Sequence, residues 1–457
     1  MNDSEFQTAV DSARIKHGVP GVSAAFFTDG RTNIASSGLT NVATGVEMTS
    51  DAIMHIGSIT KLINATILMQ LVEEGKVSLD RALLEYWPEF RLGDRAATPE
   101  ITVEMLVNHT SGIDGTLLPD RGHDEETIEK TARRFAGVGQ VHPPNGGRSY
   151  CNAGTVLAGY LSQRLTGKSW YDLVKERVFG PLEMNHSAVL PEDALLYRAS
   201  VGHFRDLATN RITRSSHLFL PIGYASAGAT AMMSAGDLLT FLRAHLADGV
   251  APNGTRLLSA ENAVRMRQPS GTVSGTAAFD CGIAWIRNQA EIVQHGGGGP
   301  GIVSFAFIHP KTQTAAAVLT NAEHGVDVLA DLINPLAREH AGFEPFPLPP
   351  APSNVSIAQP ERYVGTYENS SEVHQVTLRD GRLMWAARSQ YQFYDSSHLE
   401  APAPTPLVPA ADGRFLGDRG HGLAARDTAV IGFSEPDASG RMRYLNQRLW
   451  LYRRVAA

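Results

Sequence analysis

The chain has 457 residues, of which 43% are hydrophobic and 19% charged, a composition typical of a globular protein. The length exceeds that of one typical domain and predicts two. A net charge of -7 without a basic block disfavours nucleic-acid binding, and two cysteines, Cys151 and Cys281, cannot form a disulfide framework, although they could form one bridge.

The N-terminal segment MNDSEFQTAVDSARIKHGVPG favours an amphipathic helix with Phe6, Val10 and Ile15 on one side. It has neither the basic start nor the apolar stretch of a secretory signal, and no run in the chain is long enough to span a membrane. We therefore expect a cytoplasmic protein with no membrane partner.

Strand-like segments lie at both ends of the first 340 residues. The segments VSAAFF, TDGR and TNIASSG predict a strand, a turn and a strand. Residues 50–250 are mainly helical, after which GIAWIRN, EIVQH, IVSFAFIHP and TAAAVLTNA predict strands and VDVLADLINPLAREHAG a closing helix. This order indicates an α/β (α+β) domain whose single sheet is built from both ends of the segment, with helices inserted between.

A second domain follows a proline-rich linker. The segment EPFPLPPAPSN has five prolines and favours extended, semi-rigid chain. Beyond it, HQVTLRDGRLMWAA alternates around Asp380-Gly381, which is a strong hairpin signal, and RMRYLNQRLWLYRRV is also strand-like. We assign residues 1–343 to the first domain, 344–354 to the linker and 355–457 to an antiparallel β domain.

One helix carries an unexpected polar pair. The segment HIGSITKLINATILMQLVEEGK is apolar on nearly all sides and so belongs in the interior, yet Lys61 follows Ser58 by three residues on the same face. The helix N-terminus favours negative charge, burial lowers a lysine pKa, and a weak hydroxyl beside a base is the minimal activated nucleophile. The alternative is a capping serine and a lysine that extends to solvent, and the spacing alone does not decide.

Two further motifs decide it. With Tyr150 and Asn152 in RSYCNAG and His295 in VQHGGGGPG, the sequence resembles the penicillin-binding-protein and class C β-lactamase superfamily of serine acyl-enzymes. That superfamily has Ser-x-x-Lys, then Tyr-x-Asn, then Lys-Thr-Gly or His-x-Gly on a strand, in this order. The resemblance covers residues 5–340 and implies an antiparallel sheet flanked by helices, with a helical subdomain.

The resemblance also implies roles in catalysis. Ser58 attacks a carbonyl and becomes acylated, while Lys61 and Tyr150 exchange protons with its hydroxyl and the leaving group. Tyr150 requires a site that favours phenolate, which Lys61 and the nearby dipoles would supply. Asn152 orients Lys61 and binds a substrate amide, and His295 completes the proton network or meets a polar substrate group.

The same resemblance places substrate-binding groups on the glycine-rich strand, namely Gly296, Gly297 and Gly298. The backbone N–H groups of Ser58 and Gly298 would form an oxyanion hole. Taken singly, Tyr150 and Asn152 could only satisfy hydrogen bonds of a loop, and His295 could only end a strand. That all three have such structural roles at once is a poor explanation of the ordered motifs. Cys151 is interpreted as a packing residue, and His109 and Ser111 as structural.

Other motifs are rejected. GGGGPG is followed by a predicted strand and not by a helix, which disfavours a dinucleotide site. The sequence contains no G-x-S-x-G segment, which disfavours an α/β-hydrolase. The histidines form no metal-binding motif, so we expect neither a metal nor a cofactor.

Departures from the superfamily pattern bear on the substrate. His295 and Gly296 replace a lysine and a threonine that would hold a β-lactam carboxylate, which disfavours antibiotic defence and cell-wall crosslinking. The C-terminal domain resembles the lipocalin-like domains of some peptidases and of penicillin-binding-protein-type thioesterases, which release and cyclise nonribosomal peptides. The sequence leaves the oligomeric state open.

We therefore predict a serine hydrolase acting on a peptide amide or ester, of the D-aminopeptidase, carboxypeptidase or esterase kind. The substrate would be a small molecule or a peptide. Acyl transfer to an amine and a non-catalytic binding module are the alternatives.

Overall fold

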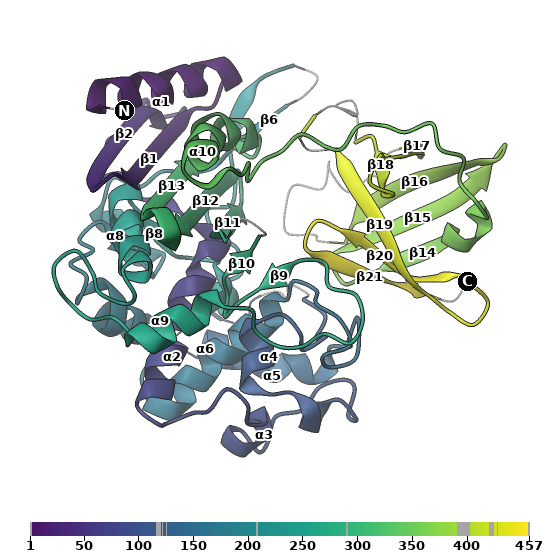
Figure 1. Cartoon of the computed structure of the whole chain (residues 1–457). Coiled ribbons are helices and arrows are strands. Elements are labelled where there is room, and N and C mark those ends of the chain that lie inside the picture. Colours follow the sequence, from purple (N-terminus) through teal and green to yellow (C-terminus); the bar gives the residue numbers. More distant parts are fainter. Residues whose placement is uncertain are drawn as a thin grey trace.

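The computed structural model shows two bodies joined by one connection (Figure 1). The structure describes residues 2–115, 120, 122–124, 126–206, 209–288, 291–390, 403–419, 425–426 and 428–455. The first body is a large antiparallel sheet with helices on both faces, and the second is a closed β-barrel. This confirms the predicted fold class, whereas the domain boundaries at residues 343 and 355 stay predictions.

The main sheet joins the two ends of the first body. Its eight strands run in the order β3-β2-β1-β13-β12-β11-β10-β9. β1 pairs antiparallel with β13, from Val22 opposite Thr320 to Phe27 opposite Ala315, so the N-terminal hairpin lies beside the later strands. The strands are β1 Gly21–Thr28, β2 Arg31–Asn41, β3 Val46–Glu47, β9 Asp280–Cys281, β10 Ile286–Arg287, β11 Val293–Gly299, β12 Ile302–His309 and β13 Thr314–Thr320.

Two details of this sheet differ from the sequence expectation. Of the predicted strand GIAWIRN only Ile286–Arg287 is extended in the sheet, because Ala284 has a positive φ of 62°. β11 continues beyond the predicted EIVQH through the glycines to Gly299. The glycine segment is therefore part of the sheet itself.

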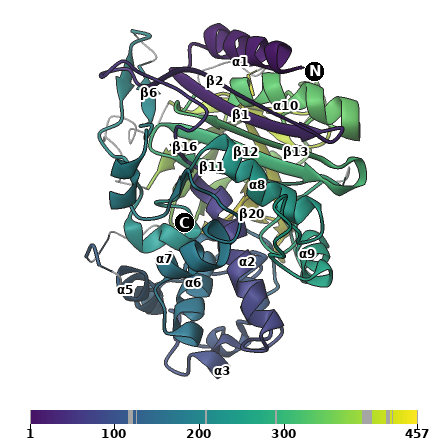
Figure 2. The same cartoon turned by 90° about the vertical axis from the view of Figure 1, so that its left-hand side faces the viewer.

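Helices α1 (Asp3–His17) and α10 (Val326–Ala341) cover one face of the sheet, and α8 (Ala235–Leu246) packs on the other (Figure 2). Asn2 and Glu5 form a capping box at the start of α1. The buried face of α1 consists of Phe6, Val10 and Ala13. The assignment of Ile15 to that face is wrong: it is 66% exposed, because the buried positions follow the spacing i, i+4, i+7.

A helical subdomain lies below the sheet. It contains α2 (Thr60–Glu73), α3 (Leu83–Tyr86), α4 (Val103–Val107), α5 (Thr127–Arg134), α6 (Asn152–Thr166), α7 (Trp170–Val174) and α9 (Ala260–Arg267). Two small sheets complete the body: β4 Met54–His55 with β8 Met232–Met233 and β5 Ser187–Ala188, and β6 His203–Arg205 with β7 Ile212–Arg214.

Helix α2 is the buried helix that the sequence indicated. All its residues from Thr60 to Met69 are buried, together with Leu71. Each fully buried Leu or Ile contributes roughly 1.5–3 kcal/mol to folding. The helix is therefore stably packed, and the side chains of its first turn are held in fixed positions.

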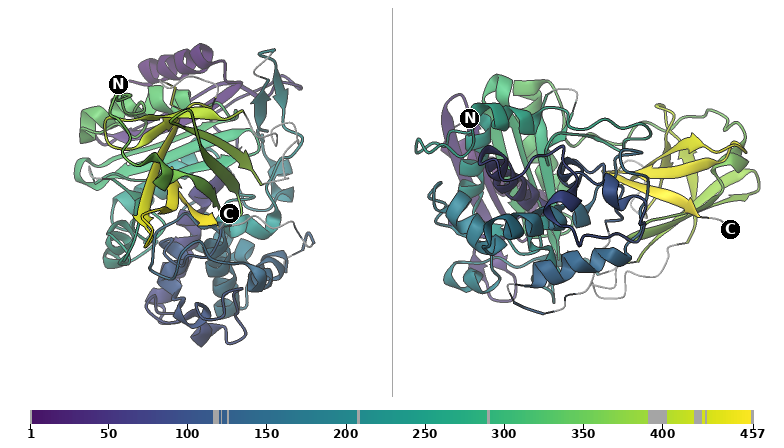
Figure 3. Two further views of the ribbon diagram at one scale, coloured as in Figure 1. Left: turned by 90° about the vertical axis from the view of Figure 1, so that its right-hand side faces the viewer. Right: turned by 90° about the horizontal axis from the view of Figure 1, so that it is seen from below.

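The C-terminal body is an eight-stranded barrel closed by the pairing of its first and last strands (Figure 3). The strands are β14 Gly365–Glu368, β15 Glu372–Arg379, β16 Arg382–Ser389, β17 Thr405–Pro409, β18 Phe415–Gly417, β19 Ala429–Pro436, β20 Met442–Gln447 and β21 Trp450–Val455. The predicted hairpin at Asp380-Gly381 joins β15 to β16, and both turn residues have positive φ, as this turn requires.

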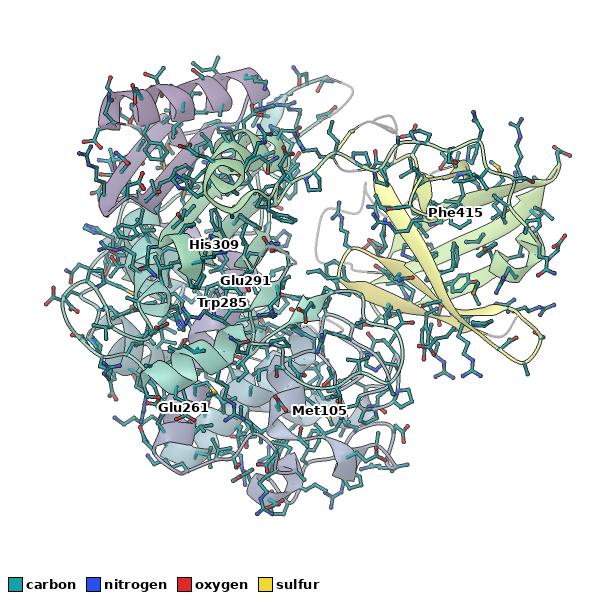
Figure 4. All side chains as sticks on the ribbon, in the orientation of Figure 1. Met105, Glu261, Trp285, Glu291, His309 and Phe415 are labelled. Atoms are coloured by element: carbon teal, nitrogen blue, oxygen red, sulfur yellow. The ribbon has the colours of Figure 1, made fainter. Side chains whose placement is uncertain are left out.

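Apolar side chains fill the barrel interior, where Phe415 lies in the hydrophobic cluster (Figure 4). A polar network borders this cluster. Tyr452 Oη donates to Glu372 Oε2 (2.9 Å), His374 Nε2 lies 3.1 Å from the same oxygen, and Trp385 Nε1 donates to His374 Nδ1 (3.1 Å). Because His374 Nδ1 accepts, its proton is on Nε2 and is donated to Glu372.

The helices of the described ranges include none long and apolar enough to cross a membrane.

Candidate active site

The backbone around Ser58 is packed so closely that only glycine fits at its neighbours. Ser58 lies in a 3-10 turn, Gly57–Ile59, that leads directly into α2. A Cβ on Gly57 would lie 2.6 Å from the Gly298 nitrogen, and one on Gly228 would lie 2.8 Å from the Ser58 nitrogen. Gly57 has φ 54° and Gly228 has φ 116°, which L side chains rarely adopt. Three chain segments therefore meet at the serine.

The glycine strand β11 lies along this turn. A Cβ on Gly297 would lie 2.0 Å from the Ile56 carbonyl, to which Ser304 Oγ also donates a hydrogen bond (2.9 Å). The pairing of β11 with β10 ends at Gln294, whereas its pairing with β12 continues to Gly299. Gly298 is exposed and has open space where a side chain would be.

The glycine segment thus presents one backbone edge next to Ser58. Gly296 also has no close neighbour at its Cβ position, the nearest atom being 3.8 Å away. This arrangement can support an oxyanion hole made by the N–H groups of Ser58 and Gly298, which stays a prediction.

Lys61 is buried beside the serine. Its Nζ lies 3.1 Å from Ser58 Oγ and also donates to the carbonyl of Ala227. The side chain is 1% exposed, and this burial lowers its pKa from 10.5 to about 7, although the nearby Cys151 acts in the opposite direction. Near neutral pH about half of such lysines are uncharged, and an uncharged amine can accept the Ser58 proton while keeping its bond to Ala227.

Tyr150, just before α6, completes a compact group. Lys61 Nζ lies 4.9 Å from the centre of its ring, and the His295 ring lies 6.0 Å away between centroids. Among the described residues the Tyr150 hydroxyl has no hydrogen-bond partner. Burial raises its pKa above the usual value of 10, an effect that the Ser58 hydroxyl partly opposes. The expected phenolate-favouring site is therefore not what the structure shows, because loss of hydration dominates.

His295 is buried and neutral. Its Nδ1 lies 2.6 Å from the Gly296 carbonyl and so donates to it, which leaves Nε2 as an acceptor. Nε2 has no partner among the described residues, and burial, together with the charge of Lys61, lowers the pKa to about 3. A neutral imidazole cannot replace the permanent cation of a lysine at this position.

Asn152 is the first residue of α6 and is half-buried. Within the described ranges no hydrogen bond joins it to Lys61, whose orientation comes from Ala227 and Ser58 instead. The structure thus brings Ser58, Lys61, Tyr150 and the glycine strand together and gives Asn152 no bond to the lysine.

Cys151 and His109 contact the Tyr150 segment and the start of α6. Cys151 Sγ accepts the Gly154 N–H (3.2 Å) at the start of α6, and burial raises its pKa to about 11. Cys151 N–H donates to His109 Nδ1 (3.1 Å), and the His109 ring stacks on Tyr150 at 4.6 Å. Cys151 and Cys281 are both free, so the single bridge that two cysteines would permit is not formed.

Two contributors to the site leave no signal in the sequence. One is the Ala227 carbonyl, which no side-chain motif could reveal. The other is the barrel: Tyr150 N–H donates to the Leu449 carbonyl (2.8 Å), and the Trp450 ring lies 5.5 Å from that of Tyr150. The barrel turn that carries Leu449 lies about 300 residues along the chain from Tyr150, so nothing in the sequence near Tyr150 indicates this contact.

A cavity of about 1650 Å³ lies elsewhere, between the helical subdomain and the barrel, and its lining includes Gln140, His142, Tyr444 and Arg453. None of the motif residues lines it. Hydrogen-bond geometry, not cavity size, therefore identifies the candidate site. Within the described part of the chain, no group of three or more His, Cys, Asp or Glu residues could hold a metal ion.

Known proteins resemble this chain over most of its length. Penicillin-binding protein 4 of Amycolatopsis lactamdurans is 34% identical over 377 residues, covering 80% of this chain and 98% of the relative. The crystal structure of SurE has a TM-score of 0.79 at 22% identity and covers 99% of both chains. D-amino acid amidase from Ochrobactrum anthropi SV3, complexed with L-phenylalanine, has a TM-score of 0.60 at 24% identity, covering 74% of this chain and 99% of its own.

The first body carries the family identity. The Beta-lactamase family profile matches residues 5–338, which include every motif residue of the site. The chain belongs to the beta-lactamase family.

Proposed function

We propose that this protein is a serine hydrolase that forms an acyl-Ser58 intermediate on aminoacyl amides or esters. The observation that carries the proposal is the 3.1 Å contact between Lys61 Nζ and Ser58 Oγ, in a setting that holds the lysine pKa at about 7. A hydroxyl beside an uncharged amine is an activated nucleophile.

In the first half-reaction, uncharged Lys61 accepts the Ser58 proton as Oγ bonds to the substrate carbonyl carbon. The negative oxygen that forms is held by the N–H groups of Ser58 and Gly298. When the C–N or C–O bond breaks, Tyr150 donates its proton to the leaving amine or alcohol and takes the proton of Lys61 in return. The high pKa of Tyr150 suits this relay, because the phenol stays protonated until the leaving group needs its proton.

In the second half-reaction water attacks the acyl group. Lys61 accepts a proton from the water as its oxygen bonds to the carbonyl carbon, and Ser58 regains a proton as its bond to the acyl group breaks. The products are a carboxylic acid and the free enzyme.

A substrate without a carboxylate beside the scissile bond is supported by the site. Because His295 is neutral and Gly296 has no hydroxyl, the third motif offers no cation for a β-lactam carboxylate. Structural relatives have been crystallised with D-Leu and with D-phenylalanine, which supports a D-aminoacyl group on the acyl side.

A substrate panel tests the proposal. It consists of p-nitrophenyl esters, paired D- and L-aminoacyl amides and nitrocefin, each run with the wild type and with Ser58→Ala. We expect ester and D-amide turnover, little nitrocefin turnover, and a loss of about 10³-fold or more in the variant. Turnover that survives Ser58→Ala would contradict the mechanism, and preferential nitrocefin hydrolysis would contradict the substrate class.

Acyl transfer to an amine is the second candidate. Lys61 and Tyr150 can take the proton of an attacking amine as well as that of water, so the same residues support both reactions. A peptide thioester offered with and without an amine acceptor distinguishes the two: a linear acid supports hydrolysis, and an amide or macrocycle supports transfer. A folded protein that forms no adduct with acylating reagents would instead support a non-catalytic binding module.

A further inference from the structure

The loop between β20 and β21 of the barrel lies against the segment that carries Tyr150. Tyr150 N–H donates to the Leu449 carbonyl (2.8 Å), and Leu451 N–H donates to Ser149 Oγ (3.0 Å). Both bonds use backbone groups of the barrel, so the path of this loop fixes the path of the Tyr150 segment. The first and second bodies thus meet at a residue of the candidate active site.

The Tyr150 ring is held from both bodies. His109 stacks on it at 4.6 Å between centroids with an interplanar angle of 27°, and Trp450 meets it at 5.5 Å and 69°, an edge-to-face contact. Such aromatic pairs stabilise the ring position beyond what burial of their area contributes. Tyr150 is 6% exposed while Trp450 is half-buried, so the Trp450 ring covers one side of Tyr150 and itself stays partly open to solvent.

Independent contacts hold the barrel in this position. Ser370 N–H donates to Asp114 Oδ2 (2.9 Å), and its hydroxyl donates to the same carboxylate. Val141 of the first body packs with Tyr444 and Leu451 of the barrel. The hairpin of β20 and β21 is therefore held against the first body by hydrogen bonds and by apolar contact, which fixes the backbone position of Trp450.

We propose that Trp450 is a positioning residue of the active site, supplied by the barrel, that fixes the Tyr150 ring and excludes water from the Tyr150–Lys61 pair. This inference rests on the proposed function, because it concerns the proton relay through Tyr150. It assigns the barrel a part in the acylation step: without its hairpin the first body has the motif residues but not a fixed Tyr150.

Removing the Trp450 ring has two consequences. Tyr150 gains room to move, and a displacement of about 1 Å of a catalytic group can cost 10²-fold in rate. Water also gains access to the Tyr150 ring, which lies 4.9 Å from Lys61 Nζ, and this weakens the desolvation that lowers the lysine pKa. The titratable or charged groups around Lys61 are Ser58, Tyr150, Cys151, His109 and His295, with Arg148 and Asp114 farther out.

The test is the rate at which a fluorophosphonate phosphonylates Ser58 Oγ, with release of fluoride, in the full-length protein, measured from pH 5.5 to 10. For Trp450→Ala we expect at least about a tenfold lower rate at neutral pH and an upward shift of the midpoint of the pH profile. Trp450→Phe keeps an aromatic ring and should recover most of the rate. Trp450→Leu fills space without a ring and serves if the alanine variant is poorly folded.

Tyr363→Leu is the matched control, because Tyr363 packs against Phe415 and Phe433 in the barrel and takes no part in the contacts described for the β20–β21 hairpin. It should keep the wild-type midpoint. Trp450→Ala and Trp450→Leu variants that are folded by thermal melting and keep the wild-type rate and midpoint would overturn the inference. A wild-type protein that is not labelled at Ser58 would instead contradict the proposed function, so the two failures are distinguishable.

Discussion

The substitution Cys151→Asp should move the pH dependence of Ser58 acylation to higher pH. Cys151 precedes α6, and its Sγ accepts the Gly154 N–H, which is the position and the bond that an N-terminal aspartate favours. The variant should therefore fold, and the helix N-terminus stabilises the new carboxylate. The Cys151 thiol is neutral at pH 7, but a charge at this position raises the Lys61 pKa, so the aspartate carboxylate stabilises the lysine cation.

The magnitude follows from the position of Lys61. A lysine with a pKa of about 7 is half uncharged at pH 7, whereas one at the usual 10.5 would be uncharged in about 0.03% of molecules. Burial therefore makes roughly 10³-fold more base available. An opposite charge within about 4–6 Å moves a pKa by about 1–3 units, so the variant should lose about 10- to 10³-fold in rate at pH 7 and recover as the pH rises.

The assay is the second-order rate of Ser58 acylation by a p-nitrophenyl ester, or of its phosphonylation by a fluorophosphonate, between pH 5.5 and 10.5. Cys151→Ser is the matched control, because it keeps the helix-capping acceptor without a charge, and its midpoint should stay near 7. An aspartate variant that is folded and has the wild-type midpoint would refute the assignment of Lys61 as the base.

Two further predictions concern the scaffold. Gly228→Ala should lower the free energy of unfolding by about 3 kcal/mol and abolish acylation, because the new Cβ would lie 2.4 Å from the Gly57 carbonyl oxygen. Gly254 is also at positive φ but has open space around it, so Gly254→Ala should lower the free energy of unfolding by only about 1 kcal/mol. Urea denaturation measures both changes. Equal costs would contradict the packing argument. In the barrel, burial acts to raise the pKa of Glu372, but the interaction with His374, the charge of Arg419 and the hydrogen bond from Tyr452 outweigh it. Together they lower the pKa from 4.5 to about 2. The carboxylate thus stabilises the fold above pH 4.5, and this contribution is lost as the pH falls towards 2. Glu372→Gln should lower the Tm at pH 7 and flatten its decrease between pH 4.5 and 2, and an unchanged profile would contradict the network.

Much of the architecture is encoded in local patterns. The apolar periodicity and turn residues predict the sheet made from both ends of the first body, the buried helix after Ser58 and the hairpin at Asp380-Gly381. The expectation that Ile15 lies on the buried face is wrong. An apolar residue outside the buried positions of a helix lies on another face, although the sequence as a whole still looks amphipathic. The strand predicted around Ile286 is too long because Ala284 adopts a positive φ, which the residue type alanine does not indicate.

In the candidate site, too, some groups are indicated by the sequence and others are not. Ser58, Lys61, Tyr150 and His295 are identified by residue type and spacing, because the chemistry needs those side chains. The Ala227 carbonyl and the Leu449 carbonyl are backbone groups, and every residue has one, so sequence offers no signal for them. The pKa of Tyr150 was misjudged because the balance between burial and a neighbouring amine depends on packing in three dimensions.

The central claim is that uncharged Lys61 activates Ser58, and the most direct test is intact-mass and peptide analysis of the fluorophosphonate adduct. Wild type, Ser58→Ala and Lys61→Met are treated side by side at pH 8. The account predicts one adduct, located on Ser58, in the wild type, none in Ser58→Ala, and labelling about 10³-fold slower in Lys61→Met. A folded wild-type protein without an adduct, or a Lys61→Met variant labelled at the wild-type rate, would contradict it.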